Sequence, residues 1–137
     1  MTGYVIFLNG GPIAFRSGKQ KVTGISSCEN EYIAATLVAS ETIATRDLLN
    51  FAGSIQDSPT VVFCDNKAAV MLSDSNTSSK RMKHIATRIA FLREATKDKK
   101  IVLYHVNGTG QLADIFTKPL GAPAFHALRH LFMETPN

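Results

Sequence analysis

The chain has 137 residues, 45% of them hydrophobic, which is enough for one domain spanning residues 1–137 with a buried core. Its formal net charge is +4 at pH 7, and eight of the fifteen Lys and Arg residues fall between positions 80 and 100. A concentrated basic segment favours a polyanionic partner such as nucleic acid, and the alternative interpretation is a solvated helix face.

The two cysteines, Cys28 and Cys64, have no metal-type spacing and do not predict a disulfide framework. No apolar run approaches the length of a membrane-spanning helix, and Tyr4 to Leu8 is too short for the core of a signal peptide. We therefore expect an intracellular protein, in the cytoplasm or nucleus, with no membrane partner.

The first part of the chain predicts two strands followed by a long helix. Tyr4–Leu8 and Pro12–Phe15 are apolar runs on either side of a glycine turn, and Ser17–Gly18 predicts a break or bulge in the second strand. Ser26 followed three residues later by Glu29 is a capping box, which predicts a helix to about residue 50. Its predicted apolar stripe is Ile33, Ala34, Leu37, Val38, Ala44, Leu48 and Leu49.

The remainder of the chain alternates predicted strands and helices. In chain order we expect a strand at Val61–Cys64, helices at Lys67–Leu72 and about Lys80–Lys97, a strand at Ile101–Val106, and helices at Gln111–Lys118 and Ala122–Met133. In the helix ending at Lys97, Ile85, Ile89 and Leu92 should point inward. This order indicates an α/β domain with a mixed sheet flanked by helices.

Asp65 is the strongest site candidate from the residues alone. It ends the apolar run Val61–Cys64, so a buried strand would deliver it to the edge where α/β sheets bind ligands. A helix N-cap is the alternative role. Glu31 and Asp114 are two further acids that could converge on it, although Glu31 could instead be a first-turn acid favoured by the helix dipole, with Glu29 competing for the site role.

Five motifs, in order and in register, resemble the ribonuclease H domain of copia-type (Pseudoviridae) retrotransposon polyproteins, and the resemblance covers essentially the whole chain. They are Thr2–Ile13, Ser26–Ala35, Phe63–Asn66, Lys83–Ile85 and Gln111–Leu120. The resemblance implies a ribonuclease H-like mixed sheet flanked by helices. It also implies metal-dependent hydrolysis of the RNA strand of an RNA/DNA hybrid.

The resemblance implies that Glu31, Asp65 and Asp114 are the catalytic, metal-binding carboxylates. Two cations about 3.5–4 Å apart must share such ligands, and hard oxygen donors select Mg²⁺ or Mn²⁺. Arg81, His84 and Arg88 lie together on the expected basic helix and are candidate nucleic-acid contacts, with a solvated helix face as the alternative. The rest of a reverse transcriptase polyprotein is a further possible partner.

One departure from the family concerns the amino-terminal part of the chain. The family has a central first strand carrying its first catalytic aspartate, whereas this sequence has no aspartate before Asp47. We therefore expect a truncated domain that lacks this strand and is inactive by itself. The alternatives are a non-enzymatic, exapted fragment that binds a partner protein or nucleic acid, and a fragment of a longer polyprotein whose upstream segment supplies the strand.

Overall fold

The computed structural model describes residues 1–19, 27–65, 67, 70 and 85–133, and the side chains of residues 27–29, 31 and 109 lie outside this description. The chain divides into two compact units. Unit 1 comprises Met1–Thr23 and Asn107–Asn137, and unit 2 comprises Gly24–Val106. Each unit has its own secondary structure and packing, and the single domain expected over the whole chain stays a prediction.

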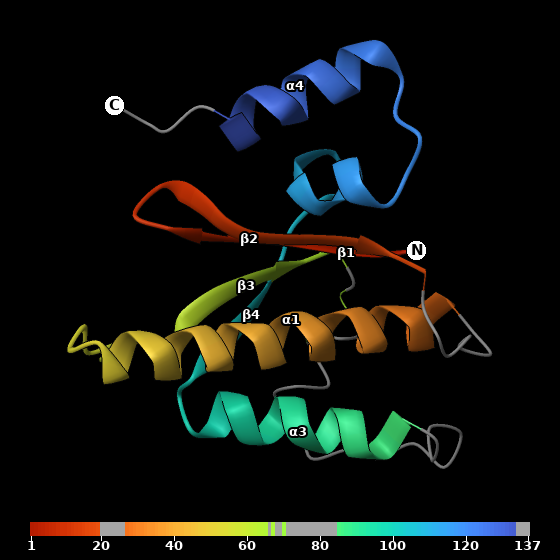
Figure 1. Cartoon of the computed structure of the whole chain (residues 1–137). Coiled ribbons are helices and arrows are strands. Elements are labelled where there is room, and N and C mark those ends of the chain that lie inside the picture. The colour runs from red at the N-terminus through yellow and green to blue at the C-terminus, as the bar shows by residue number, and fades with distance from the viewer. Residues whose placement is uncertain (20–26, 66, 68–69, 71–84, 134–137) are drawn as a thin grey trace. The chain divides into compact units, whose positions relative to one another are not determined.

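Unit 2 is built on a parallel pair of strands, β3 (Thr60–Cys64) and β4 (Ile101–His105), against which helices α1 (Ser27–Phe51) and α3 (Ala86–Lys97) pack (Figure 1). Alternate residues of a strand face the same side, so Val62 shares one face with its β4 partner Leu103. This face packs against the two helices. Together they form one buried cluster of Tyr32, Ala35, Ala39, Val62, Ile85, Ile89, Leu92, Ala95, Ile101 and Leu103.

The two helices of unit 2 differ in how well their buried faces were predicted. Ile85, Ile89 and Leu92 are buried, which confirms the predicted inward face of the second helix. That helix begins at Ala86. Residues 80–84, which the sequence predicted to be the start of this helix, lie outside the described residues.

The predicted apolar stripe of α1 is wrong at its carboxyl end, where Leu48 is 67% exposed while Thr42 and Arg46 are buried. Those two residues continue the face begun by Ala35 and Ala39 at helical spacing. Polar side chains are buried there because Arg46 bonds to the segment that leads into β3.

Unit 1 begins with an antiparallel hairpin of β1 (Thr2–Leu8) and β2 (Gly11–Gly18). Its turn residues Asn9 and Gly10 have φ angles of 50° and 81°, as expected for an Asn-Gly hairpin turn. The predicted break at Ser17–Gly18 is wrong, because both residues pair with β1. The register instead shifts between Ile6 and Phe7, opposite a segment that contains Pro12, which has no N–H to donate to the ladder.

The carboxyl-terminal part of unit 1 contains the 3₁₀ helices η2 (Gly108–Gly110) and η3 (Leu112–Phe116) and the helix α4 (Ala122–Met133). The short helix predicted at residues 111–118 is therefore present in 3₁₀ form. η3 contacts β1, and α4 contacts η3 and β2. Four aromatic rings join these elements with centroid separations of 5.5–6.2 Å, from Phe7, Phe15, Phe116 and Phe132.

The described strands form two separate two-stranded sheets, β1–β2 and β3–β4. The prediction of a mixed α/β chain is confirmed, but a single mixed sheet is not found among these strands. The ribonuclease H-like arrangement itself stays a prediction. Within the described residues, every helix is too short or too polar to cross a membrane.

The carboxyl end of α3 provides a test of backbone strain. Lys99 and Lys100 donate their N–H groups to Thr96 O and Ala95 O, the bonding pattern of a Schellman cap. Lys99 has a φ of 56° at the position where glycine is preferred, whereas the equivalent cap of α1 has Gly53 at 87°.

Replacing Lys99 with glycine should therefore raise the free energy of unfolding by about 1 kcal/mol, because glycine adopts this φ without a Cβ clash. The matched control is Lys97→Gly, which removes the same charge from the last turn of the helix and should destabilise by about 1 kcal/mol. Urea denaturation measures both. Destabilisation by both variants would contradict a strained Lys99.

Candidate functional site

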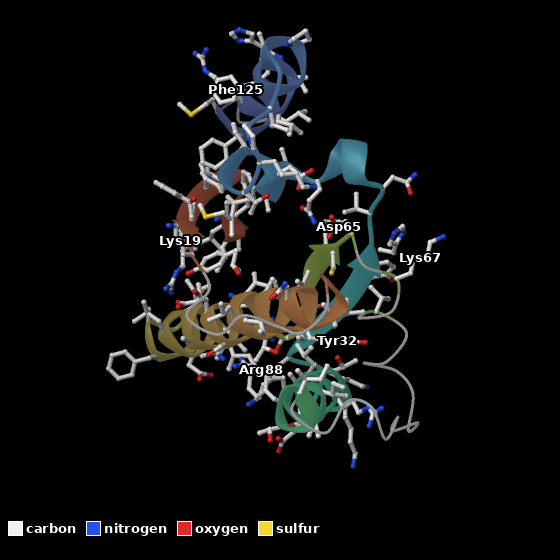
Figure 2. All side chains as sticks on the ribbon, turned by 90° about the vertical axis from the view of Figure 1, so that its right-hand side faces the viewer. Lys19, Tyr32, Asp65, Lys67, Arg88 and Phe125 are labelled. Carbon is white, nitrogen blue, oxygen red and sulfur yellow. The ribbon has the colours of Figure 1, made fainter. Side chains whose placement is uncertain are left out.

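Asp65 stands where the sequence predicted it, directly after the last residue of β3 (Figure 2). β3 is one of two parallel strands, so Asp65 lies at a carboxyl end of the pair, and it is exposed to solvent. The alternative helix N-cap role depends on residues 66, 68 and 69, which lie outside the described residues. The position is suited to binding a cation or a polar ligand.

The other end of β3 is fixed by Arg46 of α1. Its guanidinium donates to Gln56 O at 2.6 Å, to Ser58 O at 2.8 Å and to the Thr60 hydroxyl at 2.8 Å. Arg46 is only 8% exposed, so these bonds replace those that the charged group would make with water. The entry of the chain into β3, and hence the strand that delivers Asp65, depends on this residue.

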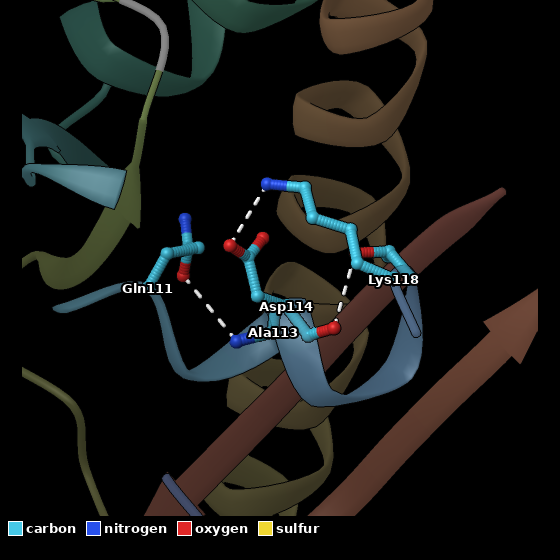
Figure 3. Close-up of polar contacts among 5 residues, drawn as sticks. Gln111, Ala113, Asp114 and Lys118 are labelled. Atoms are coloured by element: carbon cyan, nitrogen blue, oxygen red, sulfur yellow. Dashed lines mark hydrogen bonds and ion pairs between the residues drawn. The ribbon is translucent and has the colours of Figure 1, made fainter. Parts of the chain in front are cut away.

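Asp114 lies in η3 of unit 1, and its carboxylate is paired with a lysine (Figure 3). Lys118 Nζ is 2.8 Å from Asp114 Oδ2, and the Asp114 side chain is only 13% exposed. The Gln111 side chain accepts from the N–H of Ala113 at 3.5 Å, which caps the start of η3. A cation that binds Asp114 through Oδ2 must displace the Lys118 ammonium from this oxygen.

Gly3 of β1 allows η3 to approach the hairpin closely. A Cβ atom on Gly3 would lie 2.7 Å from Thr117 Cγ2, 2.8 Å from Phe116 Cβ and 3.2 Å from Ala113 O. The Ser17 hydroxyl donates to Phe116 O at 2.6 Å, so β2 holds the same segment. The position of Asp114 relative to the hairpin therefore depends on the missing side chain of Gly3.

The three predicted carboxylates do not all lie in one unit. Glu31 on α1 and the strand before Asp65 both belong to unit 2. Asp114 belongs to unit 1. The side chain of Glu31 lies outside the described residues. Among the side chains that the structure does describe, no three of His, Cys, Asp or Glu gather as metal ligands. Convergence of these three carboxylates stays a prediction.

The predicted nucleic-acid contacts are described only in part. Arg88 is half-buried on α3, and Arg81 and His84 lie outside the described residues. Sequence reasoning missed Lys118 as the partner of Asp114, although their i, i+4 spacing is a recognised signal for an ion pair. It also missed the burial of Arg46. The signal for this burial is that Arg46 lies on the same helical face as the buried alanines of α1.

Gly3→Ala should destabilise unit 1 by about 1–3 kcal/mol, because the added methyl group overpacks the contact with η3. Backbone NMR shifts should change along Leu112–Phe116. The control is Gly18→Ala, where the nearest atom to the added Cβ would be Arg16 Nε at 3.7 Å, an ordinary contact. Equal effects of the two variants would show that Gly3 does not limit this packing.

Arg46→Met should lower the free energy of unfolding by about 2–3 kcal/mol, because carbonyl groups at the entry to β3 lose a charged donor. Arg129→Met is the control, since Arg129 is exposed on α4 and its replacement should change stability by about 0.5 kcal/mol or less. Thermal unfolding followed by circular dichroism measures both. A small effect at Arg46 would mean that water readily replaces its bonds.

Comparison with known proteins identifies relatives in plant transposons. The chain is 37% identical over 123 residues, 90% of its length, to the retrovirus-related Pol polyproteins from transposons RE2 and RE1 of Arabidopsis thaliana. It is 32% identical over 130 residues, 95% of its length, to the corresponding polyprotein from transposon TNT 1-94 of Nicotiana tabacum. No protein-family model and no solved structure gives a significant match. The chain spans only 8–10% of these curated relatives, so it is homologous to a small region of retrotransposon Pol polyproteins.

Proposed function

We propose that this chain corresponds to the ribonuclease H region of a copia-type retrotransposon polyprotein, a region that cuts the RNA strand of RNA/DNA hybrids. The observation that carries the proposal is homology to Pol polyproteins over 90% of the chain, combined with an exposed acid at the carboxyl end of a parallel strand. The rest of a reverse transcriptase polyprotein is the natural partner of such a region.

The proposed site uses Glu31, Asp65 and Asp114 as ligands of Mg²⁺ or Mn²⁺. Carboxylate oxygens are the hard donors that these ions prefer. When bound, a pair of such ions activates water and stabilises the leaving oxygen in phosphodiester hydrolysis. The Lys118 side chain is 54% exposed on a flexible stem, so it can move from Asp114 when a metal ion binds.

The basic residues would hold the substrate rather than cut it. Arg88, with Arg81 and His84 in the preceding segment, would contact phosphate oxygens of the hybrid. Phosphate contacts set affinity and its dependence on salt, without selecting a base sequence. This is consistent with a nuclease that acts on many hybrid sequences.

The proposed site has three carboxylates in this polypeptide, and the first aspartate that the resemblance implies has no counterpart among its residues before Asp47. We expect that the 137-residue polypeptide alone does not cleave. Its remaining carboxylates would become competent only when another segment supplies the missing acid. An exapted, non-enzymatic binding role is the outcome if no such complementation occurs.

The test is Mg²⁺-dependent cleavage of a labelled RNA/DNA hybrid by the 137-residue chain and by the same chain extended with an aspartate-bearing first strand. Only the extended chain should cut, and Asp65→Asn in that chain should reduce cleavage to background. Glu41→Gln, at an exposed position of α1, is the matched control and should leave cleavage unchanged. Cleavage by neither chain would contradict the proposed enzyme, and cleavage by the unextended chain would contradict its incompleteness.

A further inference from the structure

Two histidines lie on one face of α4, the helix that spans Ala122–Met133 (Figure 1). His126 and His130 are four positions apart in this helix. An α-helix places side chains at this spacing one turn apart, with Cβ atoms about 5–6 Å from each other. Both side chains are exposed to solvent. The pair lies within one helix, so its geometry follows from the backbone of that helix alone.

Two imidazole groups one helical turn apart can bind a single metal ion. Metalloproteases use the same spacing on a helix, where two histidines bind zinc and a glutamate directly after the first histidine is the catalytic base. In α4 the residue after His126 is Ala127, which has no acid group. The spacing therefore supports metal binding by the pair and does not support protease chemistry.

The donor atoms of the pair select the class of metal ion. Imidazole nitrogen suits Zn²⁺, Cu²⁺ and Ni²⁺, whereas Mg²⁺ and Ca²⁺ prefer oxygen ligands. The pair is thus chemically distinct from the carboxylates proposed above as ligands of Mg²⁺ or Mn²⁺. Among the described side chains, no third His, Cys, Asp or Glu joins the pair, so water would complete the coordination of a bound ion.

The surroundings of the two rings also bear on cation binding. His130 lies in the last turn of α4, where the partial negative charge of the helix carboxyl terminus favours a cation. The ring of His126 contacts that of Phe125 edge to face, with centroids 5.9 Å apart, which restricts the imidazole while leaving it exposed. Arg129 is a positive charge next to the pair and opposes a cation, but it is exposed, so water and salt screen it.

We propose that His126 and His130 form a two-histidine site on α4 for a divalent transition-metal ion such as Zn²⁺ or Cu²⁺. Each imidazole contributes one nitrogen, and the ion links the last two turns of the helix. Such an ion binds the helical form of this segment more tightly than the unfolded form, and so stabilises the helix. Leu128 is the one buried residue of α4 among those that the structure describes, so a link between turns adds to limited packing.

Isothermal titration calorimetry of the full chain with Zn²⁺, and separately with Cu²⁺, tests this proposal. Replacing one histidine, by His126→Ala or His130→Ala, should weaken binding at least tenfold, because a single imidazole remains. His105→Gln is the control, since His105 is half-buried on β4 and its replacement should leave this binding unchanged. An excess of Mg²⁺ should not displace Zn²⁺ from the site.

A rearranged helix separates the spacing of the histidines from their number. The double variant His130→Leu with Leu131→His has the same composition, and both positions are exposed. It moves the second imidazole to a place roughly 140° around the helix from His126, where the two rings cannot share an ion. Binding should weaken as much as in the single alanine variants, while other donors of the chain contribute the same background. Circular dichroism establishes that each variant is folded.

Nuclear magnetic resonance gives a second readout that only a shared ion would produce. One equivalent of Zn²⁺ should shift the ring signals of His126 and His130 together, and it should slow amide exchange in the last two turns of α4. Equal affinity of the original chain and the double variant would overturn the proposal. So would zinc-induced shifts confined to one of the two rings, or equal weakening by His105→Gln.

Discussion

The parallel pairing of β3 with β4 is the interaction on which unit 2 depends. Two strands alone form a marginal sheet, and here helices α1 and α3 stabilise the pair by burying one of its faces. Tyr32, Leu92 and Ile101 are each only 1% exposed at this contact. Because the pairing is parallel, its register also sets which residues of β3 direct their backbone groups toward β4.

In unit 1 the corresponding constraint is steric. Gly3 has no side chain, so η3 approaches β1 closely enough for Phe116 to stack on Phe15 with ring centroids 5.5 Å apart. The Asp114 side chain is only 13% exposed, and a nearby positive charge offsets the cost of its burial. Lys118 supplies that charge, and a metal ion would supply the same compensation in its place.

The sequence predicted the strands, the long helix, the buried face of α3 and the position of Asp65, because each depends on local periodicity or on a change in composition. It did not predict the burial of Arg46, since a charged side chain is buried only where a distant segment offers acceptors, here at Gln56 and Ser58. The shifted register near Pro12 depends on pairing between strands, which periodicity within one strand does not specify. Convergence of carboxylates from different elements likewise depends on tertiary arrangement, so it stays a prediction.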